Sequence, residues 1–328
     1  MNIDYFSHCR TALKFGLMHL NLKEGDVVHI PEFICDVILH PLNQLGLKYK
    51  YYPVMDDLSP DWSVLTKAIE NDSKALLMVH YFGQPQNIKL FKSFCLERDL
   101  LLIEDNAHGY GGRYNSKLPG TFGDVGVSSP RKTLELSDGG VLYLNTSTTN
   151  QENSLSHLER QATNKYKDWL KKFFKRNAGL KMYYRKYMKE RPKYWDPIAF
   201  SEAVIDDKLI STQSERTIQQ ANIDEIVKYR REKYFYWSSF ANKHNLRPLI
   251  SSLDHGACPL LFPVYTSGSD ESRKWFDWGW DNGVNVYSWP SLPKELSVNG
   301  GPAFDRWSKL ICFPIEENMN TMNFDGEK

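Results

Sequence analysis

The residues in this chain that could do chemistry together begin with an acid and a lysine, Asp105 and Lys132. Asp105 follows the apolar run 100–103, as expected for a buried parallel strand that delivers a charged side chain to the carboxyl edge of a sheet, where open α/β folds bind ligands. Lys132 lies in a short loop, with glycine-rich segments on both sides at 109–112 and 139–140. This spacing indicates a cofactor that needs both an acid and an amine.

The cofactor that fits this pair is pyridoxal phosphate. Its aldehyde forms a Schiff base with a lysine, and its ring nitrogen stays protonated only beside a carboxylate. Lys132 and Asp105 supply these two groups. Strand-end acids and loop lysines are also common in proteins that bind no cofactor, so the pair alone leaves a purely structural role open.

The residues around the pair resemble a known family. The segments Ile103–His108 (IEDNAH) and Gly123–Gly126 (GDVG), and the step from Lys132 to Asp138-Gly139-Gly140, resemble the sugar-nucleotide aminotransferases of the DegT type. These are fold-type-I pyridoxal-phosphate enzymes that aminate nucleotide-linked keto sugars. Three more segments are similar to the family, so the resemblance covers most of the first 145 residues; they are 25–27, 57–61 and 79–85.

The resemblance implies a role for each of these residues. Lys132 would carry the internal aldimine, Asp105 would pair with the pyridinium, and His108 would lie near the ring hydroxyl of the cofactor. The loop before the lysine is about two residues shorter than the usual family version, which makes Ser129 the expected phosphate contact and Ser128 the fallback.

A second phosphate contact is expected at the start of the first helix. Leucines at helical spacing predict a helix over 8–22, and the N–H groups and dipole at a helix start suit a phosphate. The family has a Gly-Thr step here, whereas this chain has Cys9-Arg10-Thr11, so we expect Arg10 and Thr11 to contact the phosphate; an ordinary helix start is the alternative. Phe33 either covers one face of the cofactor ring or is a core residue.

Strand and helix patterns alternate through this half of the chain. Strands are expected at 26–31, 49–54, 75–80, 100–105 and 125–127, with helices at 31–46 and 87–98 between them. Strands separated by helices of this length predict a parallel sheet with helices on both faces. The fold class is therefore α/β: a fold-type-I, three-layer α/β/α large domain with a mainly parallel sheet, followed by a small α+β domain.

The boundary between the two domains is expected near residue 210, giving a large domain over 1–210 and a small one over 211–328. From Ser211 the chain has a long helical pattern, which in the family leads into the small domain. Segments 259–265, 283–290 and 310–315 are expected to be strands of that domain. Compared with the family both ends are short, which should affect substrate-closing arms and dimer contacts more than cofactor chemistry.

Composition narrows the class of protein further. The 328 residues carry 41 basic and 40 acidic side chains, so the whole protein is not built to bind a polyanion. The five cysteines are dispersed without a C-x-x-C pair, which favours reduced thiols in the cytoplasm and neither a disulfide framework nor a metal site. No signal peptide or membrane-spanning run is visible.

One segment, 165–193, is strongly basic, with twelve Lys or Arg and two acids. Its apolar residues at i, i+4 predict two amphipathic helices that form an excursion from the large domain. A solvated face, attraction of the substrate's diphosphate, and peripheral contact with an anionic membrane are the three interpretations. Nucleic-acid binding is not expected, because the chain has no base-reading motif.

Together these observations predict a pyridoxal-phosphate-dependent aminotransferase. It would move an amino group, with glutamate as the expected donor, to a nucleotide-linked keto sugar for surface-glycan (O-antigen-like, lipopolysaccharide) synthesis, as a cytoplasmic homodimer. One rival is a pyridoxamine-dependent sugar dehydratase, a branch in which a histidine replaces the lysine. The other is a non-catalytic paralogue that binds or scaffolds in glycan assembly.

Overall fold

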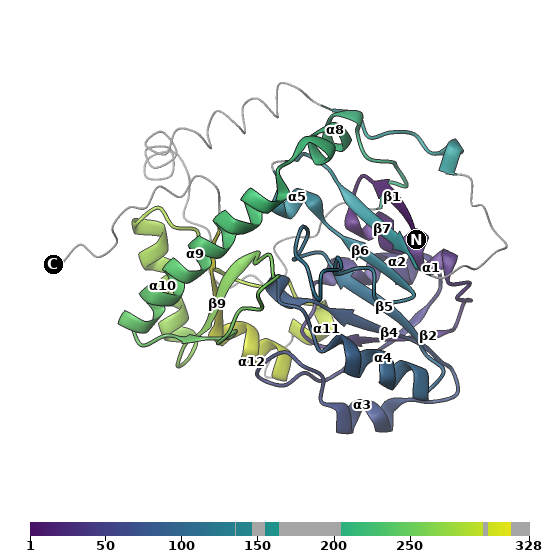
Figure 1. Cartoon of the computed structure of the whole chain (residues 1–328). Helices are drawn as coiled ribbons and strands as arrows, with labels where there is room; N and C mark the ends of the chain where they lie inside the picture. The colour runs from purple at the N-terminus through teal and green to yellow at the C-terminus, as the bar shows by residue number, and fades with distance from the viewer. Residues whose placement is uncertain (135, 146–154, 164–204, 298–300, 316–328) are drawn as a thin grey trace.

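The computed structural model describes residues 1–134, 136–145, 155–163, 205–297 and 301–315. The basic segment 165–193 therefore lies outside the described residues. The described chain forms a seven-stranded sheet, built from the first 145 residues, and a four-stranded sheet built from the C-terminal third (Figure 1).

The seven-stranded sheet has the order β1-β7-β6-β5-β4-β2-β3. Strands β2 to β6 run parallel, and β7 is antiparallel to both of its neighbours, β6 and β1. Apolar side chains fill the central strands on both faces, as expected where helices cover both sides of a parallel sheet. The strands are β1 (Asn2–Phe6), β2 (Val27–Pro31), β3 (Lys48–Tyr52), β4 (Ser73–Val79), β5 (Leu101–Asn106), β6 (Val125–Ser128) and β7 (Gly140–Leu144).

Helices cover the two faces of this sheet. Helix α1 (Cys9–His19) packs on β6 and β7 and contacts α2 (Leu39–Gln44), which follows the 3-10 turn η1 (Asp36–Ile38). Helices α3 (Trp62–Ala68) and α4 (Ile88–Glu97) lie together below the sheet in Figure 1 and meet where Trp62 packs edge-on against Phe91, with ring centroids 4.9 Å apart. Right-handed crossovers that step in opposite directions along the sheet place these two pairs on opposite faces.

The four-stranded sheet has the order β10-β11-β9-β8, and all of its pairings are antiparallel. Its long helix α9 crosses the middle of Figure 1 and packs on β9 and β8. The elements of this half are α8 (Thr212–Gln220), α9 (Ile223–Lys243), β8 (Arg247–Pro248), β9 (Leu261–Tyr265), α10 (Ser269–Asp281), β10 (Tyr287–Ser288), α11 (Lys294–Ser297), α12 (Pro302–Lys309) and β11 (Leu310–Pro314). The short turns η2 (Tyr81–Gly83), α5 (Pro130–Thr133) and η3 (Leu155–His157) connect elements of the first half.

The apolar core joins the two halves of the molecule. One cluster extends from the seven-stranded sheet to Leu261 of β9, Trp307 of α12 and Cys312 of β11. A second cluster, centred on the fully buried Trp237, lies between α9, α10 and the four-stranded sheet. Elements of the C-terminal half are therefore packed directly against the edge of the large sheet where ligands are expected.

The fold agrees with the α/β class expected from the sequence. The predicted strands at 26–31, 49–54, 75–80, 100–105 and 125–127 are all present, and so is the helix at 87–98. The strands expected at 259–265 and 310–315 are β9 and β11, whereas β10 keeps only two residues of the segment 283–290.

Two expected helices differ from the structure. The helix expected at 31–46 is limited to η1 and α2, because the chain after β2 stays extended and Glu32 N donates to the carbonyl of Tyr52 at 2.9 Å. The helical pattern after Ser211 is two helices, because Ala221 is extended and Asn222 caps α9 by accepting from Glu225 N. The edge strand β1 was not expected from the sequence.

Candidate functional site

Asp105 lies at the carboxyl end of β5, as the sequence predicts. The register pairs it with Val79 of β4 on one side and Val127 of β6 on the other, so three parallel strands end together around it. Its side chain is buried, and Oδ1 accepts a hydrogen bond from Ala107 N at 2.8 Å. In the described part of the chain Oδ2 accepts no hydrogen bond, so this oxygen is open to a donor on a bound group.

The electrostatics of Asp105 reflect burial and a nearby cation. Burial raises the pKa of Asp105, and the Ala107 N–H and the charge of Lys132 oppose that rise. The structure therefore brings Asp105 and Lys132, which are 27 residues apart in the sequence, within electrostatic range of each other. A carboxylate that is buried without a full set of partners is well suited to a cationic ligand.

Lys132 lies in the short helix α5, which follows β6 directly. Its Nζ makes no ion pair with any described residue, and its charge also opposes the burial effects that raise the pKa values of the Cys9 and Cys35 thiols. Its backbone is anchored by Arg230 of α9, whose Nη2 donates to the Lys132 carbonyl at 3.1 Å. The lysine is thus held by its main chain while its amine stays available.

Arg230 is a buried anchor between the two halves of the molecule. Besides Lys132, its guanidinium bonds the carbonyls of Pro259 at 3.1 Å and Leu260 at 3.3 Å, just before β9. A planar guanidinium can serve several carbonyls at once in a fixed geometry, which suits it to this junction. The C-terminal half therefore sets the position of the segment that carries Lys132.

His108 lies beside the acid and the lysine. Its Nδ1 accepts a hydrogen bond from Phe82 N at 3.1 Å, which leaves the proton on Nε2. Burial, and secondarily the charge of Lys132, hold the pKa of His108 well below its usual range. His108 is therefore a neutral imidazole whose Nε2–H can donate to a group bound between it and Lys132.

The turn that supports His108 is strained. Phe82 adopts a left-handed φ of 56°, a conformation that costs a bulky residue on the order of 1 kcal/mol or more. Gly83, at φ 86°, can hold no side chain, since a Cβ there would meet the carbonyl oxygen of Cys258 at 2.0 Å. The bond from Leu260 N to the Phe82 carbonyl, at 2.9 Å, holds this turn against the C-terminal half.

An aromatic group closes this part of the site. Trp289, from the loop after β10, packs edge-on against His108 with ring centroids 4.6 Å apart, and against Phe82 at 5.4 Å and Phe33 at 6.0 Å. Two residues further on, Ser291 shares a contact of 3.2 Å with the Cys35 thiol. The C-terminal half therefore supplies one wall around His108.

A buried hydrogen-bonded pair, His80 and Glu104, supports the sheet edge behind the site. His80 Nε2 lies 2.8 Å from Glu104 Oε1, and Glu104 Oε2 accepts from the N–H groups of Phe122 and Gly123. Burial would raise the pKa of Glu104, but the bonds from His80 and the backbone outweigh burial and lower it. Because Gln86 N donates to His80 Nδ1 at 3.0 Å, the pair ties together the loops that follow β4 and β5.

The start of α1 binds an anion from within the chain. Ser7 Oγ and Thr11 Oγ1 both donate to Asp206 Oδ1, at 2.5 and 3.3 Å, and His8 Nδ1 lies 3.6 Å from Asp206 Oδ2. The structure thus gives the hydroxyl of Thr11 a carboxylate partner, and its contact with a cofactor phosphate stays a prediction. The buried Arg10 lies one residue before Thr11 in the first turn of the helix.

The three remaining residues that were expected to contact the cofactor, Ser129, Ser128 and Phe33, differ in their hydrogen bonds and packing. Ser129 is buried just before α5, and within the described residues its hydroxyl makes no hydrogen bond, which suits the expected phosphate contact. Ser128 Oγ instead accepts from Asn106 Nδ2 at 3.1 Å. Phe33 is fully buried in the apolar core against Tyr81 and Trp289, so the structure gives it the packing of a core residue.

The donors and acceptors at this edge fit pyridoxal phosphate. Asp105 has an open carboxylate oxygen, Lys132 has an available amine, and His108 offers a neutral N–H. The hydroxyl of Ser129 and the N-terminal turn of α1 lie close by, since the Cys9 thiol at that helix start is within electrostatic range of both Asp105 and Lys132. Among the described residues, no cluster of three or more His, Cys, Asp or Glu could hold a metal ion.

The fold and the site define an α/β transferase of the pyridoxal-phosphate-dependent class. Residues 5–186 match the DegT/DnrJ/EryC1/StrS aminotransferase family, and the chain belongs to that family. Members of the family use pyridoxal phosphate and act on sugar nucleotides. The expected family, enzyme class and cofactor are therefore confirmed.

Individual relatives cover most of the chain or its first half. The GDP-perosamine synthase of Escherichia coli O157:H7 is 25% identical over 314 residues, which span 89% of this chain and 82% of that protein. A GDP-4-keto-6-deoxy-D-mannose 3-dehydratase of Escherichia coli O55:H7 is 34% identical over 109 residues, 33% of this chain and 28% of that protein.

Solved structures confirm the fold. PseC of Helicobacter pylori, an aminotransferase involved in the biosynthesis of pseudoaminic acid, superposes with a TM-score of 0.69 at 15% identity, covering 98% of this chain and 83% of that one. No helix within the described residues is both long enough and apolar enough to cross a membrane.

Several residues of the site were not expected from the sequence. Trp289, Arg230 and Asp206 each reach the site from elements about a hundred residues or more away from the groups that they contact. The only local feature that sets Trp289 apart is a Trp-Pro step at the end of an apolar run, which indicates a turn but not its partner.

Proposed function

We propose that this protein is an aminotransferase that moves an amino group from glutamate to a nucleotide-linked keto sugar used in surface-glycan synthesis. The observation that carries the proposal is the convergence of Asp105, His108 and Lys132 at one sheet edge, in a chain of the DegT/DnrJ/EryC1/StrS family. Pyridoxal phosphate, when bound, supplies an aldehyde that takes up the amino group and a ring that delocalises the charge left on carbon.

Each residue has a distinct part in the proposed chemistry. Lys132 Nζ would hold the cofactor covalently and, once its amine is free, would accept and return the proton at the substrate carbon. Asp105, with its open Oδ2, would keep the ring nitrogen protonated. His108 would donate from Nε2 to the ring hydroxyl, and Ser129 and the start of α1, with Arg10, would bind the phosphate. Thr11 would join them by exchanging its bond to Asp206 for one to the phosphate.

The keto-sugar substrate is supported by the family and by the named relatives. GDP-perosamine synthase aligns over most of the chain, which favours a sugar on a nucleoside diphosphate, and the name of the GDP-4-keto-6-deoxy-D-mannose 3-dehydratase favours a 4-keto-6-deoxy sugar. The dehydratase relative supports a second candidate, removal of a hydroxyl group from such a sugar. Lys132 favours amine exchange, since the resemblance gives the dehydratase branch a histidine at that position.

Several further features belong to the same proposal. We expect a cytoplasmic homodimer, with a large domain over 1–210 and a small one over 211–328. Peripheral contact with an anionic membrane through 165–193 would bring the enzyme close to later steps of glycan assembly. A non-catalytic scaffold in that assembly is the alternative, and it would bind no cofactor.

Covalent labelling tests the proposal at its centre. Borohydride treatment of the protein incubated with pyridoxal phosphate should fix the cofactor on Lys132, as found by peptide mapping, and Lys132→Ala should lose turnover by several orders of magnitude. Lys117→Ala, on an exposed turn, is the matched control. A label on another lysine, or none, would overturn the assignment of Lys132.

Substrate assays then test the sugar. With glutamate and a nucleotide-linked 4-keto-6-deoxy sugar, wild-type enzyme should release 2-oxoglutarate and form the amino sugar, and a 3-keto isomer is the next substrate to try. Loss of the hydroxyl group without amination would favour the dehydratase. Turnover with ordinary keto acids but with no keto-sugar nucleotide would refute the substrate class.

A further inference from the structure

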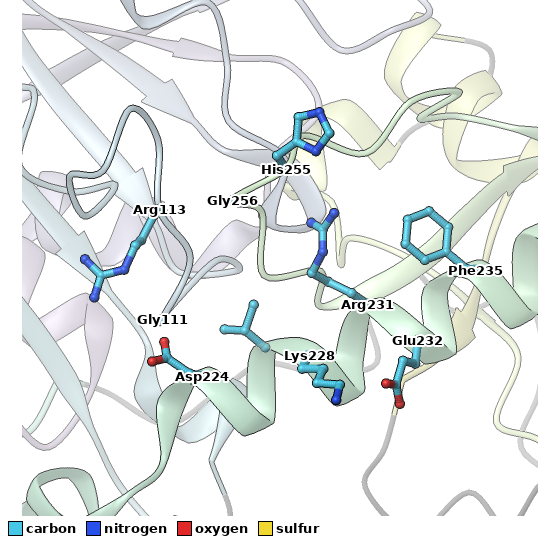
Figure 2. Close-up of a pocket in the computed structure, with 10 residues that line it drawn as sticks. Gly111, Arg113, Asp224, Lys228, Arg231, Glu232, Phe235, His255 and Gly256 are labelled. Carbon is cyan, nitrogen blue, oxygen red and sulfur yellow. The ribbon is translucent and has the colours of Figure 1, made fainter.

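A pocket of about 400 Å³ lies between α9, the glycine-rich turn and the turn with His255, and neither Asp105, His108 nor Lys132 lines it (Figure 2). One wall is the glycine-rich turn with Gly111 and Arg113, the floor is α9 with Lys228, Arg231 and Phe235, and the third side is the turn with His255. We call it the α9 pocket. Its volume is within the range of small-molecule sites in proteins.

The walls of the α9 pocket are held rigidly in place. Arg113 N donates to the carbonyl of Gly256 at 2.7 Å, which joins the two facing turns. Arg231 Nη1 donates to the carbonyls of Asp254 at 2.6 Å and Ala257 at 3.1 Å, which fastens the second turn to the helix. A pocket whose sides are already hydrogen-bonded to each other needs little ordering when a ligand binds.

The pocket is connected to the candidate site through two of its walls. The glycine-rich turn begins directly after His108, and Gly111 lies against Ile223 and Val227 of α9. On α9, Arg230 bonds the carbonyl of Lys132, while the next residue, Arg231, lines the pocket. Successive helical residues point about 100° apart, so one helix serves both places. The pocket and the candidate site therefore share α9 and the glycine-rich turn as common supports.

The side chains of the pocket suit a ligand with both a charge and a ring. Arg113 and Lys228 make no ion pair or side-chain hydrogen bond within the described part of the chain, so both cations are available to an anion. Phe235 is 51% exposed, with the Arg231 guanidinium 5.8 Å from its ring centroid, and Figure 2 shows both rising from the same side of α9. An exposed phenylalanine beside a guanidinium is a stacking surface for a planar base.

The acidic residues of the pocket narrow the class of ligand that it can bind. Asp224 and Glu232 also line it, so its formal charge is three cations less two acids, or +1 with His255 neutral. Inorganic phosphate would use the cations alone, and an amino acid would leave much of the volume empty. A nucleoside diphosphate uses all of the groups: phosphates on the cations, a base on Phe235, and ribose hydroxyls or base N–H groups donating to the acids.

We propose that the α9 pocket binds the nucleoside diphosphate part of the sugar nucleotide. The inference rests on the proposed function for the identity of the ligand, but not for the presence of the pocket. In this proposal, residues of α9 and the glycine-rich turn recognise the nucleotide part of the substrate, and other residues bind the cofactor.

Calorimetric titration of the cofactor-loaded protein with GDP, UDP and dTDP tests the assignment directly. Wild type should bind at least one of them, and the charge reversals Arg113→Glu and Lys228→Glu together should weaken that binding at least tenfold. Phe235→Ala should weaken it about tenfold, because a stacked base is lost. Lys233→Glu, the same charge change as Lys228→Glu alone but outside the pocket on α9, should leave binding unchanged, and it is the net-charge control for that single variant.

Titrations with the separate parts of the ligand show which part each pocket residue binds. Pyrophosphate alone should bind more weakly than the nucleoside diphosphate, and Phe235→Ala should not change its binding. Binding of the nucleoside alone should not change in the Arg113→Glu, Lys228→Glu variant. Wild-type binding should weaken with added salt, because exposed charges are screened. Absence of binding at millimolar concentration, or variants that bind like wild type, would overturn the assignment.

The failure of this assignment can be told apart from failure of the proposed function. If the pocket variants turn over a keto-sugar nucleotide with an unchanged KM, the assignment of the pocket is refuted and the proposed aminotransferase activity is supported. Conversely, pocket-dependent binding of a nucleoside diphosphate without amination of any sugar would keep the pocket and refute the reaction.

Discussion

Asp105 combines burial with one open oxygen, and this combination gives it a function that an exposed acid could not have. Asp105→Asn keeps the shape and the bond from Ala107 but removes the charge that stabilises a protonated ring nitrogen. We expect kcat/KM for the sugar to fall about a hundredfold, which corresponds to about 3 kcal/mol in the barrier. Steady-state kinetics on cofactor-loaded protein measure it.

The matched control for that substitution is Asp99→Asn. Asp99 is an exposed acid with a φ of 53° just before β5, and asparagine tolerates this left-handed conformation well. It should keep the wild-type rate. An Asp105→Asn enzyme that is as fast as this control would reduce Asp105 to an ordinary acid at the end of a strand.

At the residue scale, Lys132 helps to set the charge state of His108. The lysine's charge adds to burial in keeping the imidazole neutral, so His108 acts as a hydrogen-bond donor and not as a competing cation. A second cation beside Lys132 would oppose the binding of a positively charged ring. The neutral state of His108 is therefore part of what makes the site suitable for the cofactor.

Among the elements, α1 and the segment that follows Ile205 form an unexpected unit. The donors at the start of α1 hold the Asp206 carboxylate, and Lys14, one turn later, holds Asp207 at 2.6 Å. The backbone bond from Ser7 N to the carbonyl of Lys208 adds the segment to the sheet edge beside β1. The helix start therefore works as an anion site within the protein itself.

This unit predicts a dependence of stability on pH. Burial alone would raise the pKa of Asp206, but the bonds from His8 and Ser7 outweigh it and lower the pKa from its ordinary 3.8 to about 2. Because the folded-state pKa is depressed, the carboxylate stabilises the fold above about pH 4, and this contribution is lost as the pH falls through about 2.

Asp206→Asn should therefore destabilise the protein at pH 6, by on the order of 1 kcal/mol after allowance for solvent screening of a partly exposed carboxylate. The difference in urea midpoint between variant and wild type should narrow between pH 4 and pH 2.5. Asp270→Asn, an exposed acid at the start of α10, serves as the control. A difference that stays constant with pH would show that Asp206 makes no such contribution.

On the scale of the whole molecule, the C-terminal half completes a site that the first half begins. Arg230 anchors the Lys132 segment, Trp289 covers His108, and the apolar core runs without interruption from one sheet to the other. Loss of this packing would release the wall formed by Trp289 even if the large sheet stayed intact.

The proposed homodimer is tested at this same scale. Light scattering at micromolar concentration should give about twice the mass of one chain, because family members build each site from two chains, and obligate interfaces of this kind are large. Dilution should lower specific activity together with the measured mass. A monomer with full activity would refute a shared site.

The amino-acid sequence alone determined the class of fold and the chemical centre. The role of His108 and the full assignment of Lys132 came from the resemblance to the DegT-type family, whereas the pattern itself predicts the place of Asp105. Apolar runs of strand length separated by helices predict a parallel sheet, and an acid directly after such a run lies at its carboxyl edge. These features are local, because strand periodicity and the exit of the chain at a sheet edge depend on neighbouring residues only.

Tertiary structure alone decided which distant groups surround that centre. Trp289 meets His108 across 181 residues and Arg230 meets Lys132 across 98, and no local pattern encodes either partner. The start of α1 shows the same limit: its sequence predicts an anion site, but packing of a segment almost 200 residues away puts Asp206 on the hydroxyls of Ser7 and Thr11. Such contacts depend on how the two sheets pack together, because side chains from separate elements meet only once the shared core has formed.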